Sequence, residues 1–150
     1  MSGWLLDTNV IAELTRPHGA VRVRDWVIAH DDGEMFISVL TIGEYEKGLH
    51  HLSPDHKLRP RIAAGIAALE ARFSGRLLML TTSIVRRWGE VSGATKRLTG
   101  QLPPVIDTLL AATAIEHDLC LVTRNLRDVR HSGARLFNPW NGDPERLPLH

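Results

Sequence analysis

Cysteine is nearly absent from the sequence, since Cys120 is the only one among 150 residues. No disulfide can close within the chain, which excludes a small fold held by disulfides. Long apolar runs are missing too: none reaches the roughly 20 residues that a membrane-spanning helix needs. The N-terminal segment also lacks the basic region of a signal peptide. We therefore expect a soluble cytoplasmic protein without a membrane partner, in which Cys120 is a small core residue.

A large net charge is the third absence. The 18 Lys and Arg almost balance the 17 Asp and Glu, which leaves a formal net charge of +1. Such a balance does not by itself indicate a nucleic-acid binder. Basic side chains do gather locally in two groups, Arg86, Arg87, Lys96 and Arg97 in one and Arg124, Arg127 and Arg130 in the other. Alone, both groups are typical of a solvated helix face and a surface loop.

Length and hydrophobic content set the scale of the fold. A chain of 150 residues fits one domain, and 43% hydrophobic residues suffice for one ordinary core. No internal repeat, low-complexity stretch or linker divides the sequence. The residues from about 141 onward are polar and rich in proline, so we expect a single domain that ends in a loose tail.

Short apolar runs alternate with segments of helical periodicity. Strands are expected at Trp4–Leu6, Met35–Val39, Leu77–Leu80, Leu119–Thr123 and Arg135–Phe137. Helices are expected at residues 9–15, 21–30, 41–52, from 53 to 73, from 82 to about 98, and from 104 to about 117. This alternation is typical of a three-layer α/β fold, in which a parallel sheet of four or five strands has helices on both faces.

Acidic residues follow the strands where a site is expected, because ligands of a parallel sheet bind outside the carboxyl ends of its strands. Asp7 directly follows the first strand, and Glu44 lies in the helix after the second. Asn125 and Asp128 follow the strand that ends at position 123, and Asp107 lies in the first turn of the helix before it. We expect these side chains to reach one edge of the sheet.

Asp107 shares its helix face with Leu110, Ala111 and Ala114, which are apolar and should point inward. A buried charge without a partner is costly, and a second carboxylate beside it raises a pKa instead of relieving the cost. A divalent cation relieves the repulsion, and Mg²⁺ and Mn²⁺ prefer oxygen ligands. The pattern therefore predicts a cation site at this edge.

Each of these residues also has a simpler interpretation. Asp7 fits a helix cap, and Glu44 fits a capping box in which its carboxylate reaches back to the backbone N–H three residues earlier. Asp107 fits a favourable charge at a helix N-terminus, and Asn125 and Asp128 fit turn formers. These interpretations do not explain why all the acids reach the same edge. The adjacent His50 and His51 point in different directions on a helix, so they indicate surface positions rather than a metal site.

Four segments, in order, resemble the motifs of PIN-domain proteins: LLDTNVIAE at Leu5–Glu13, SVLTIGEYEKG at Ser38–Gly48, IDTLLAATA at Ile106–Ala114 and VTRN at Val122–Asn125. FNPW at residues 137–140 resembles the C-terminal end of the VapC toxin subgroup that includes FitB. The resemblance implies a parallel sheet with an acidic pocket that binds Mg²⁺ or Mn²⁺. It also implies cleavage of RNA phosphodiester bonds, a homodimer, and inhibition by a cognate VapB-like antitoxin.

The resemblance carries roles to individual positions. Asp7, Glu44 and Asp107 match the three core acids of the family, and Thr8 matches the hydroxyl residue beside the first acid. We expect Asp7 and Asp107 to contact the metal directly, and Glu44 to hold a metal-bound water or to position the attacking one. Thr8 is expected to orient Asp7 or to touch a phosphate.

The fourth motif departs from the subgroup, which often has an acid where this chain has Asn125. Asp128 is the next acid, and if a helix begins at Leu126 the two side chains share one face. We expect Asp128 to supply the fourth charge and Asn125 a supporting hydrogen bond. Arg124 is a further candidate, either for binding a substrate phosphate or for a plain surface role.

Two other acidic folds fit less well. A haloacid-dehalogenase-type phosphatase needs a second aspartate where this chain has Asn9, and a receiver domain needs a late lysine, whereas none follows Lys96. The alternative that stays open is a catalytically silent PIN-like module that binds a protein partner or a nucleic acid. Metal-dependent cleavage of RNA distinguishes a nuclease from such a module.

Overall fold

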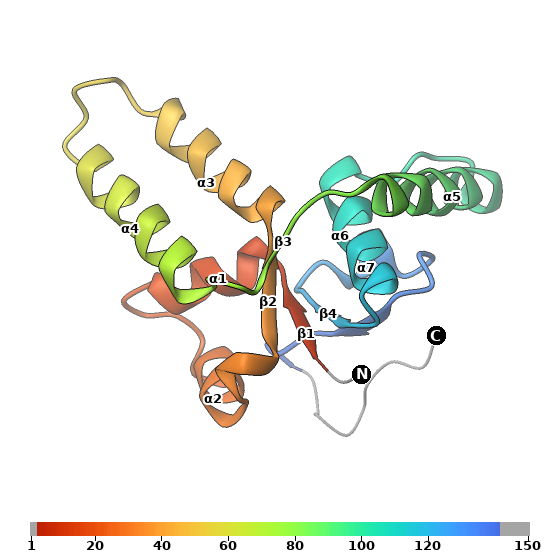
Figure 1. The fold of residues 1–150 in the computed structure, drawn as a ribbon, viewed down its shortest axis with the longest axis horizontal. Helices are drawn as coiled ribbons and strands as arrows, with labels where there is room; N and C mark the ends of the chain where they lie inside the picture. The colour runs from red at the N-terminus through yellow and green to blue at the C-terminus, as the bar shows by residue number, and fades with distance from the viewer. Residues whose placement is uncertain (1–2, 142–150) are drawn as a thin grey trace.

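The computed structural model describes residues 3–141, so the expected tail lies outside the described residues. Its centre is a parallel sheet in the order β3-β2-β1-β4-β5 (Figure 1). The five strands are β1 (Trp4–Leu6), β2 (Met35–Ser38), β3 (Leu77–Leu78), β4 (Cys120–Val122) and β5 (Arg135–Phe137). The expected α/β fold with a parallel sheet is confirmed, and the sheet has five strands.

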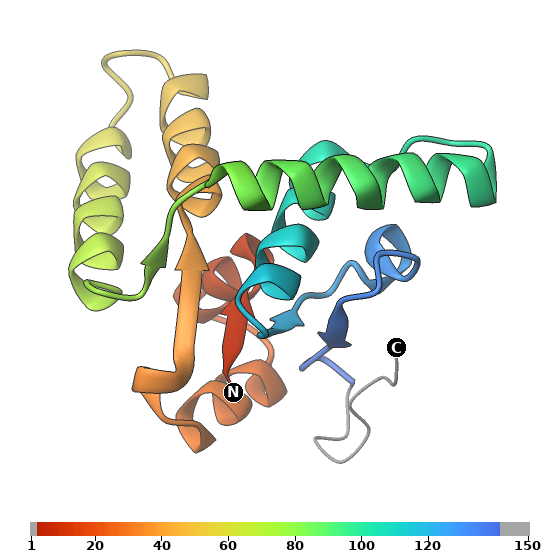
Figure 2. The same ribbon diagram turned by 45° about the vertical axis from the view of Figure 1, so that its right-hand side comes forward.

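Helices lie on both faces of the sheet and extend beyond it. They are α1 (Thr8–Thr15), α2 (Val21–Ala29), α3 (Val39–His51), α4 (Arg59–Arg72), α5 (Thr82–Thr99), α6 (Val105–Glu116) and α7 (Leu126–Val129), with a short 3-10 helix η1 (Asp32–Glu34). Figures 1 and 2 show α3 and α4 as a projecting arm on one side, while α5 runs across α6 on the other. Within residues 3–141, no helix has the length and apolar character needed to cross a membrane.

Successive residues of the strands point to opposite faces of the sheet, as the pleat requires. Leu6 and Val122 lie in the core shared with α1 and α2, whereas Leu5 and Leu121 lie in the core beneath α6. Strands that are buried on both faces need continuous apolar runs. Cys120 belongs to this core as expected, and burial raises the pKa of its thiol to about 12.

The segment before α4 differs from the expectation. A helix was expected to begin at Ser53-Pro54, which is wrong, because residues 53–58 form turns and α4 begins at Arg59. The backbone N–H of His56 bonds to Ser53 O, and that of Arg59 bonds to His56 O. Pro60 then stands in the first turn of α4, where its missing N–H costs no hydrogen bond.

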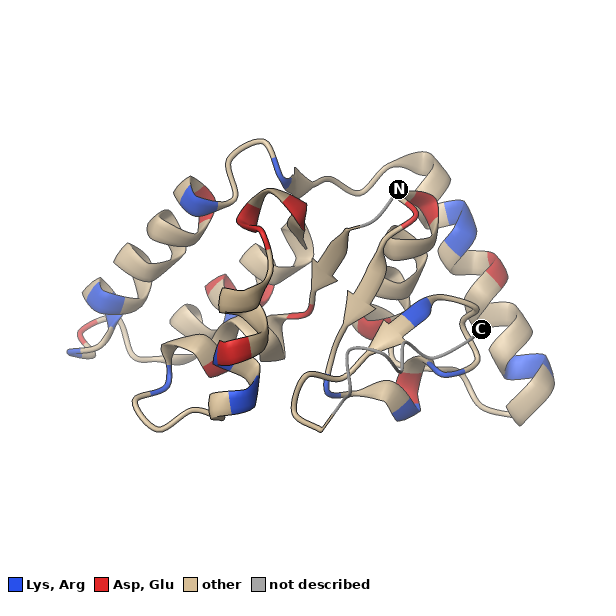
Figure 3. Ribbon diagram, turned by 90° about the horizontal axis from the view of Figure 1, so that it is seen from below, with Lys and Arg blue, Asp and Glu red and all other residues tan. Residues whose placement is uncertain are grey.

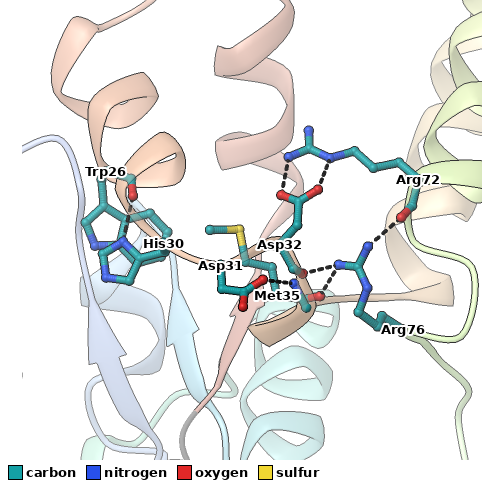
Figure 4. Close-up of polar contacts among 8 residues, drawn as sticks. Trp26, His30, Asp31, Asp32, Met35, Arg72 and Arg76 are labelled. Carbon is teal, nitrogen blue, oxygen red and sulfur yellow. Dashed lines mark hydrogen bonds and ion pairs between the residues drawn. The ribbon is translucent and has the colours of Figure 1, made fainter.

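Two arginines, Arg72 and Arg76, fix the start of β2, at the end of the strand away from its carboxyl end (Figure 4). The Arg76 guanidinium donates to Met35 O at 2.7 Å and also to Asp32 O, while the Arg76 carbonyl accepts the Ile37 N–H at 3.1 Å. Arg72 forms an ion pair with Asp32 at 2.9 Å. These bonds tie the end of α4 and the residue Arg76 beyond it to η1 and to the start of β2.

Candidate active site

The topology places the expected acids at the carboxyl ends of the strands. Asp7 follows β1 and its N–H donates to Val122 O at 2.9 Å, which continues the pairing of β1 with β4. Glu44 lies on α3 beyond β2, and Asp107 lies in the first turn of α6. Asp128 lies in α7 beyond β4. Four separate segments of the chain thus contribute one acid each.

Asp7 is buried, with 5% of its surface exposed. One carboxylate oxygen, Oδ1, accepts the Thr8 N–H at 2.6 Å, so Asp7 does cap α1. The other, Oδ2, accepts from the Thr123 hydroxyl at 2.7 Å and from the Asn9 amide at 3.2 Å. Burial raises the pKa of Asp7, and the Glu44 carboxylate adds to the rise against these hydrogen bonds. The geometry therefore allows Asp7 both to cap α1 and to belong to the cluster of acids.

Glu44 does not form a capping box, so that interpretation is wrong. Helix α3 begins at Val39, and its cap is Ser38, whose hydroxyl accepts the Leu40 N–H at 3.0 Å. Because the helix starts earlier than expected, Glu44 lies beyond its first turn and extends sideways to α1. There its Oε1 accepts a hydrogen bond from the Thr8 hydroxyl at 2.8 Å. Thr8 thus holds Glu44 through its side chain and Asp7 through its backbone.

The pKa of Asp107 is affected by the other three acids at the carboxyl ends of the strands. Burial raises its pKa to about 6, and the charges of Asp7, Asp128 and Glu44 contribute to the rise. A hydrogen bond from the Asn125 side chain acts in the opposite direction. Among the described groups that shift the pKa values of Asp7 and Asp107 there is no lysine or arginine. Neighbouring carboxylates therefore raise the pKa values of Asp7 and Asp107, and no lysine or arginine of residues 3–141 is among the groups that lower these two values.

Both residues of the fourth motif reach this cluster. Helix α7 begins at Leu126 with Asn125 at its N-cap position, as the shared-face hypothesis requires. The Asn125 side chain lowers the pKa of Asp107 as a hydrogen-bond donor, whereas the charge of Asp128 raises it.

Three polar residues of the site were not expected from the sequence: Asn9, Thr41 and Thr123. The Thr123 hydroxyl donates to Asp7 and accepts the Asn125 N–H at 3.0 Å, and Asn9 donates to Asp7. Thr41, fully buried, lies 3.0 Å from the Thr8 hydroxyl. Their one sequence signal is that each is a polar side chain at or near a strand's carboxyl end.

Arg124 lies at the rim of the site. The Arg124 guanidinium lies 5.1 Å from the centre of the Trp140 ring, and the Arg124 backbone N–H donates to the Asn9 side-chain oxygen at 3.4 Å. The pKa of Glu13 is lowered by the Ala20 N–H, by Arg16 and by the charge of Arg124. Arg124 therefore faces Trp140 and Glu13 here.

The other basic residues are spread out. Arg87 is paired with Glu116 at 2.8 Å and with Glu90 at 3.2 Å. Figure 3, seen from below, shows Lys and Arg interspersed with Asp and Glu over the helices.

The donor chemistry of the cluster suits a hard divalent cation. Carboxylate and amide oxygens are the ligands that Mg²⁺ prefers, and a cation removes the repulsion that raises the pKa of Asp107. Within residues 3–141, no three acidic, histidine or cysteine side chains already converge as a complete ligand set. The fit therefore rests on the type of donor and on the uncompensated charge.

Known proteins match this chain over most of its length. The PIN domain family matches residues 4–131. Toxin FitB of Neisseria gonorrhoeae is 30% identical over 140 residues, which cover 91% of this chain and 98% of that protein. A VapC ribonuclease of Sinorhizobium fredii is 27% identical over 137 residues, covering 91% and 96%. The crystal structure of FitAcB from N. gonorrhoeae contains a chain with a TM-score of 0.82 and 27% identity, covering 91% of this chain and 98% of that one.

Proposed function

This chain belongs to the PIN-domain family, and on that premise we propose that it is a metal-dependent endoribonuclease that serves as the toxin of a toxin–antitoxin pair. One observation carries the proposal: four segments of the chain each bring one acid to the carboxyl ends of the strands, where burial and the charges of the other three raise the pKa of Asp107 to about 6. Perturbed groups of this kind cluster at functional sites. An ion-pair network that only stabilised the fold would need cationic side chains, and none is among the described groups that shift this pKa.

The four acids divide into two kinds of role in the proposed reaction. Asp7 and Asp107 would hold Mg²⁺ or Mn²⁺ directly, with Asp128 adding charge nearby and Asn125 steadying Asp107. When bound, such a cation acts as a Lewis acid toward a phosphodiester and makes water a better nucleophile at neutral pH.

The hydrogen bonds already present prepare these side chains. Thr8, Asn9 and Thr123 hold both oxygens of Asp7, so its carboxylate cannot rotate freely. Glu44 is held through Oε1 alone, which leaves Oε2 free of hydrogen bonds to residues 3–141. We assign Oε2 the task of orienting the attacking water, whose oxygen bonds to phosphorus as the P–O ester bond breaks. Such orientation of reactants accounts for a large share of the rate enhancement in many enzymes.

The proposed partners follow from the same charges. An RNA phosphate needs a cationic side chain at the rim, and Arg124 is the candidate because its backbone is tied to Asn9 beside Asp7. A cognate VapB-like antitoxin would place a basic side chain against the uncompensated carboxylates. The matched FitAcB structure is a toxin–antitoxin complex, which supports such a partner. A homodimer is proposed from family membership.

Cleavage of total RNA by purified, antitoxin-free protein tests the function. We expect cleavage with Mn²⁺ and none in EDTA, and loss of most turnover in Asp7→Asn, Glu44→Gln and Asp107→Asn. Circular dichroism of each variant separates loss of chemistry from loss of fold. Full activity in EDTA would overturn the metal mechanism. Binding of RNA without cleavage in Mn²⁺ would instead favour the catalytically silent module.

A further inference from the structure

Thr41 is a fully buried hydroxyl residue to which the proposed function assigns no role. It lies in the first turn of α3, three residues before Glu44, so both side chains share one face of the helix. Its Oγ1 is 3.0 Å from Thr8 Oγ1, and Thr8 Oγ1 is 2.8 Å from Glu44 Oε1. The three side chains therefore form a continuous chain of oxygens from the core to the acid cluster.

The direction of the hydrogen bonds follows from what each group can donate. An ionised carboxylate only accepts, so the single hydroxyl proton of Thr8 goes to Glu44. The Thr8 oxygen is then an acceptor, and Thr41 is the donor that faces it. The chain runs from Thr41 through Thr8 to Glu44, with one proton in each step.

The Thr41 hydroxyl has a different kind of partner from the hydroxyls of the other buried threonines in helices. A helical threonine commonly bonds back to a carbonyl three or four residues earlier. Thr95 does so with Val91 O at 2.8 Å, and Thr113 does so with Leu109 O at 2.7 Å. Thr41 makes no such bond within residues 3–141, and its hydroxyl faces α1 instead. Thr41 therefore acts between helices and not within its own.

We propose that Thr41 is a positioning residue for Glu44, acting through Thr8. A donor from Thr41 occupies the Thr8 oxygen and leaves the Thr8 proton one partner, the Glu44 carboxylate. Without it, the bond to Glu44 is the only one that restrains the Thr8 hydroxyl, so the orientation of Glu44 is fixed less well. The inference rests on the proposed function, in which Glu44 orients the attacking water.

The experiment compares Thr41→Val with Thr41→Ser. Valine keeps the shape of threonine and removes the hydroxyl, whereas serine keeps the hydroxyl. We expect Thr41→Val to lower kcat for RNA cleavage about tenfold with KM unchanged, and Thr41→Ser to stay within about threefold of the wild type. The matched control is Thr95→Val, which removes a buried hydroxyl that bonds only within α5, and it should leave kcat unchanged. If Thr41→Val does not fold, Thr41→Ala replaces it, with the same expected loss.

A double-mutant cycle with Thr8→Val gives a second test. Since Thr41 acts through Thr8, the double variant should lose no more activity than Thr8→Val alone. The same cycle in metal-free protein, followed by urea unfolding, should show a threefold to tenfold coupling in the unfolding equilibrium constant. A wild-type kcat in Thr41→Val, or additive effects in both cycles, would overturn the positioning role. If the wild type cleaves no RNA, the proposed function fails, and the unfolding cycle alone decides whether the hydroxyl chain exists.

Discussion

The Thr123 hydroxyl donates a 2.7 Å hydrogen bond to Asp7 Oδ2, between residues 116 positions apart in the sequence. Both side chains are buried, and they stand at the ends of the paired strands β1 and β4. Thr123 also accepts the Asn125 N–H, so one hydroxyl joins the first acid to the fourth motif. The shape of the site therefore depends on a residue that has no charge.

Thr123→Val should destabilise the protein. The Thr123 hydroxyl lowers the pKa of Asp7 more than the other hydrogen bonds do. Its removal leaves the buried Oδ2 of Asp7 with the Asn9 amide as its donor. We expect a loss of about 1–3 kcal/mol in the free energy of unfolding at pH 7.5. The loss should shrink as the pH falls through the raised pKa of Asp7, because a protonated carboxyl needs the donor less. Urea unfolding at pH 7.5 and at a pH below the Asp7 pKa measures this loss. Thr123→Ser, which keeps the hydroxyl, is the control. A Thr123→Val protein as stable as the wild type at pH 7.5 would contradict the assigned hydrogen bond.

Asp107→Asn should stabilise the metal-free protein at neutral pH. The folded pKa of Asp107 is about 6 against an ordinary 3.8, so folding favours the protonated form. The stability that this group contributes is complete below pH 3.8 and is lost as the pH rises through about 6. Asparagine never ionises, so the variant should exceed the wild type by roughly 1 kcal/mol at pH 7.5, after allowance for solvent screening of a half-buried group.

Near pH 4 the difference between Asp107→Asn and the wild type should disappear. Addition of Mn²⁺ at pH 7.5 should reverse the order, because a ligand stabilises the form that binds it more tightly. Thermal unfolding in EDTA and in Mn²⁺ gives both comparisons. Equal stabilities at every pH would show that the charge of Asp107 is not opposed by its neighbours.

Asp128→Asn should raise the Mn²⁺ concentration for half-maximal cleavage by about tenfold, the equivalent of roughly 1.4 kcal/mol. Asn125→Ala should raise it less than about threefold, because it removes one hydrogen bond to Asp107 and no charge. The basis for this difference is that the charge of Asp128 raises the pKa of Asp107, whereas Asn125 carries no charge. A titration of cleavage rate against Mn²⁺ for both variants measures it. An unchanged requirement in Asp128→Asn would leave three acids in the site and make Asp128 a turn residue.

Arg76→Met should lower stability without changing the rate of cleavage. Its guanidinium bonds to backbone carbonyls of β2, η1 and α4, at the edge away from the acids (Figure 4). We expect a loss of about 2 kcal/mol in the free energy of unfolding. Asp32→Asn removes only an exposed ion pair with Arg72 and should cost less than about 1 kcal/mol. Urea unfolding with parallel RNA assays measures both variants. A matching drop in kcat for Arg76→Met would show that the two edges of the sheet are coupled.

The strands were predictable because a doubly covered parallel strand needs an unbroken apolar run. The second run ends one residue earlier than expected, because Val39 begins α3, and the third run differs most at its end. A strand was expected over Leu77–Leu80, but β3 stops at Leu78, and Met79 is 61% exposed. Its neighbour β2 ends at Ser38, so β3 has no partner beyond that point. Hydropathy alone does not reveal where a neighbouring strand ends.

The positions of the acids also followed from the strand ends, whereas their hydrogen-bond partners did not. Glu44 was ambiguous because Ser38 and Thr41 are equally good caps by local chemistry, and the choice between them shifts the helix start. Thr41 and Thr123 look like ordinary small residues beside apolar ones. Their partners lie on other elements, 33 and 116 positions away, so no local pattern connects them.

The strand order has a consequence for the time during which the chain is being made. β1 is synthesised first, yet one of its two neighbours in the sheet is β4, which is among the last elements made. Val122 follows Glu44 by 78 positions, which take roughly 4–16 s to synthesise at about 5–20 residues per second. During that interval the ribosome carries first two and, once Asp107 has been made, three of the acids without a complete site. Under the proposed function, the nascent chain does not cleave the mRNA that is being translated. A truncated mRNA that ends before the codons for β4 yields an inactive product.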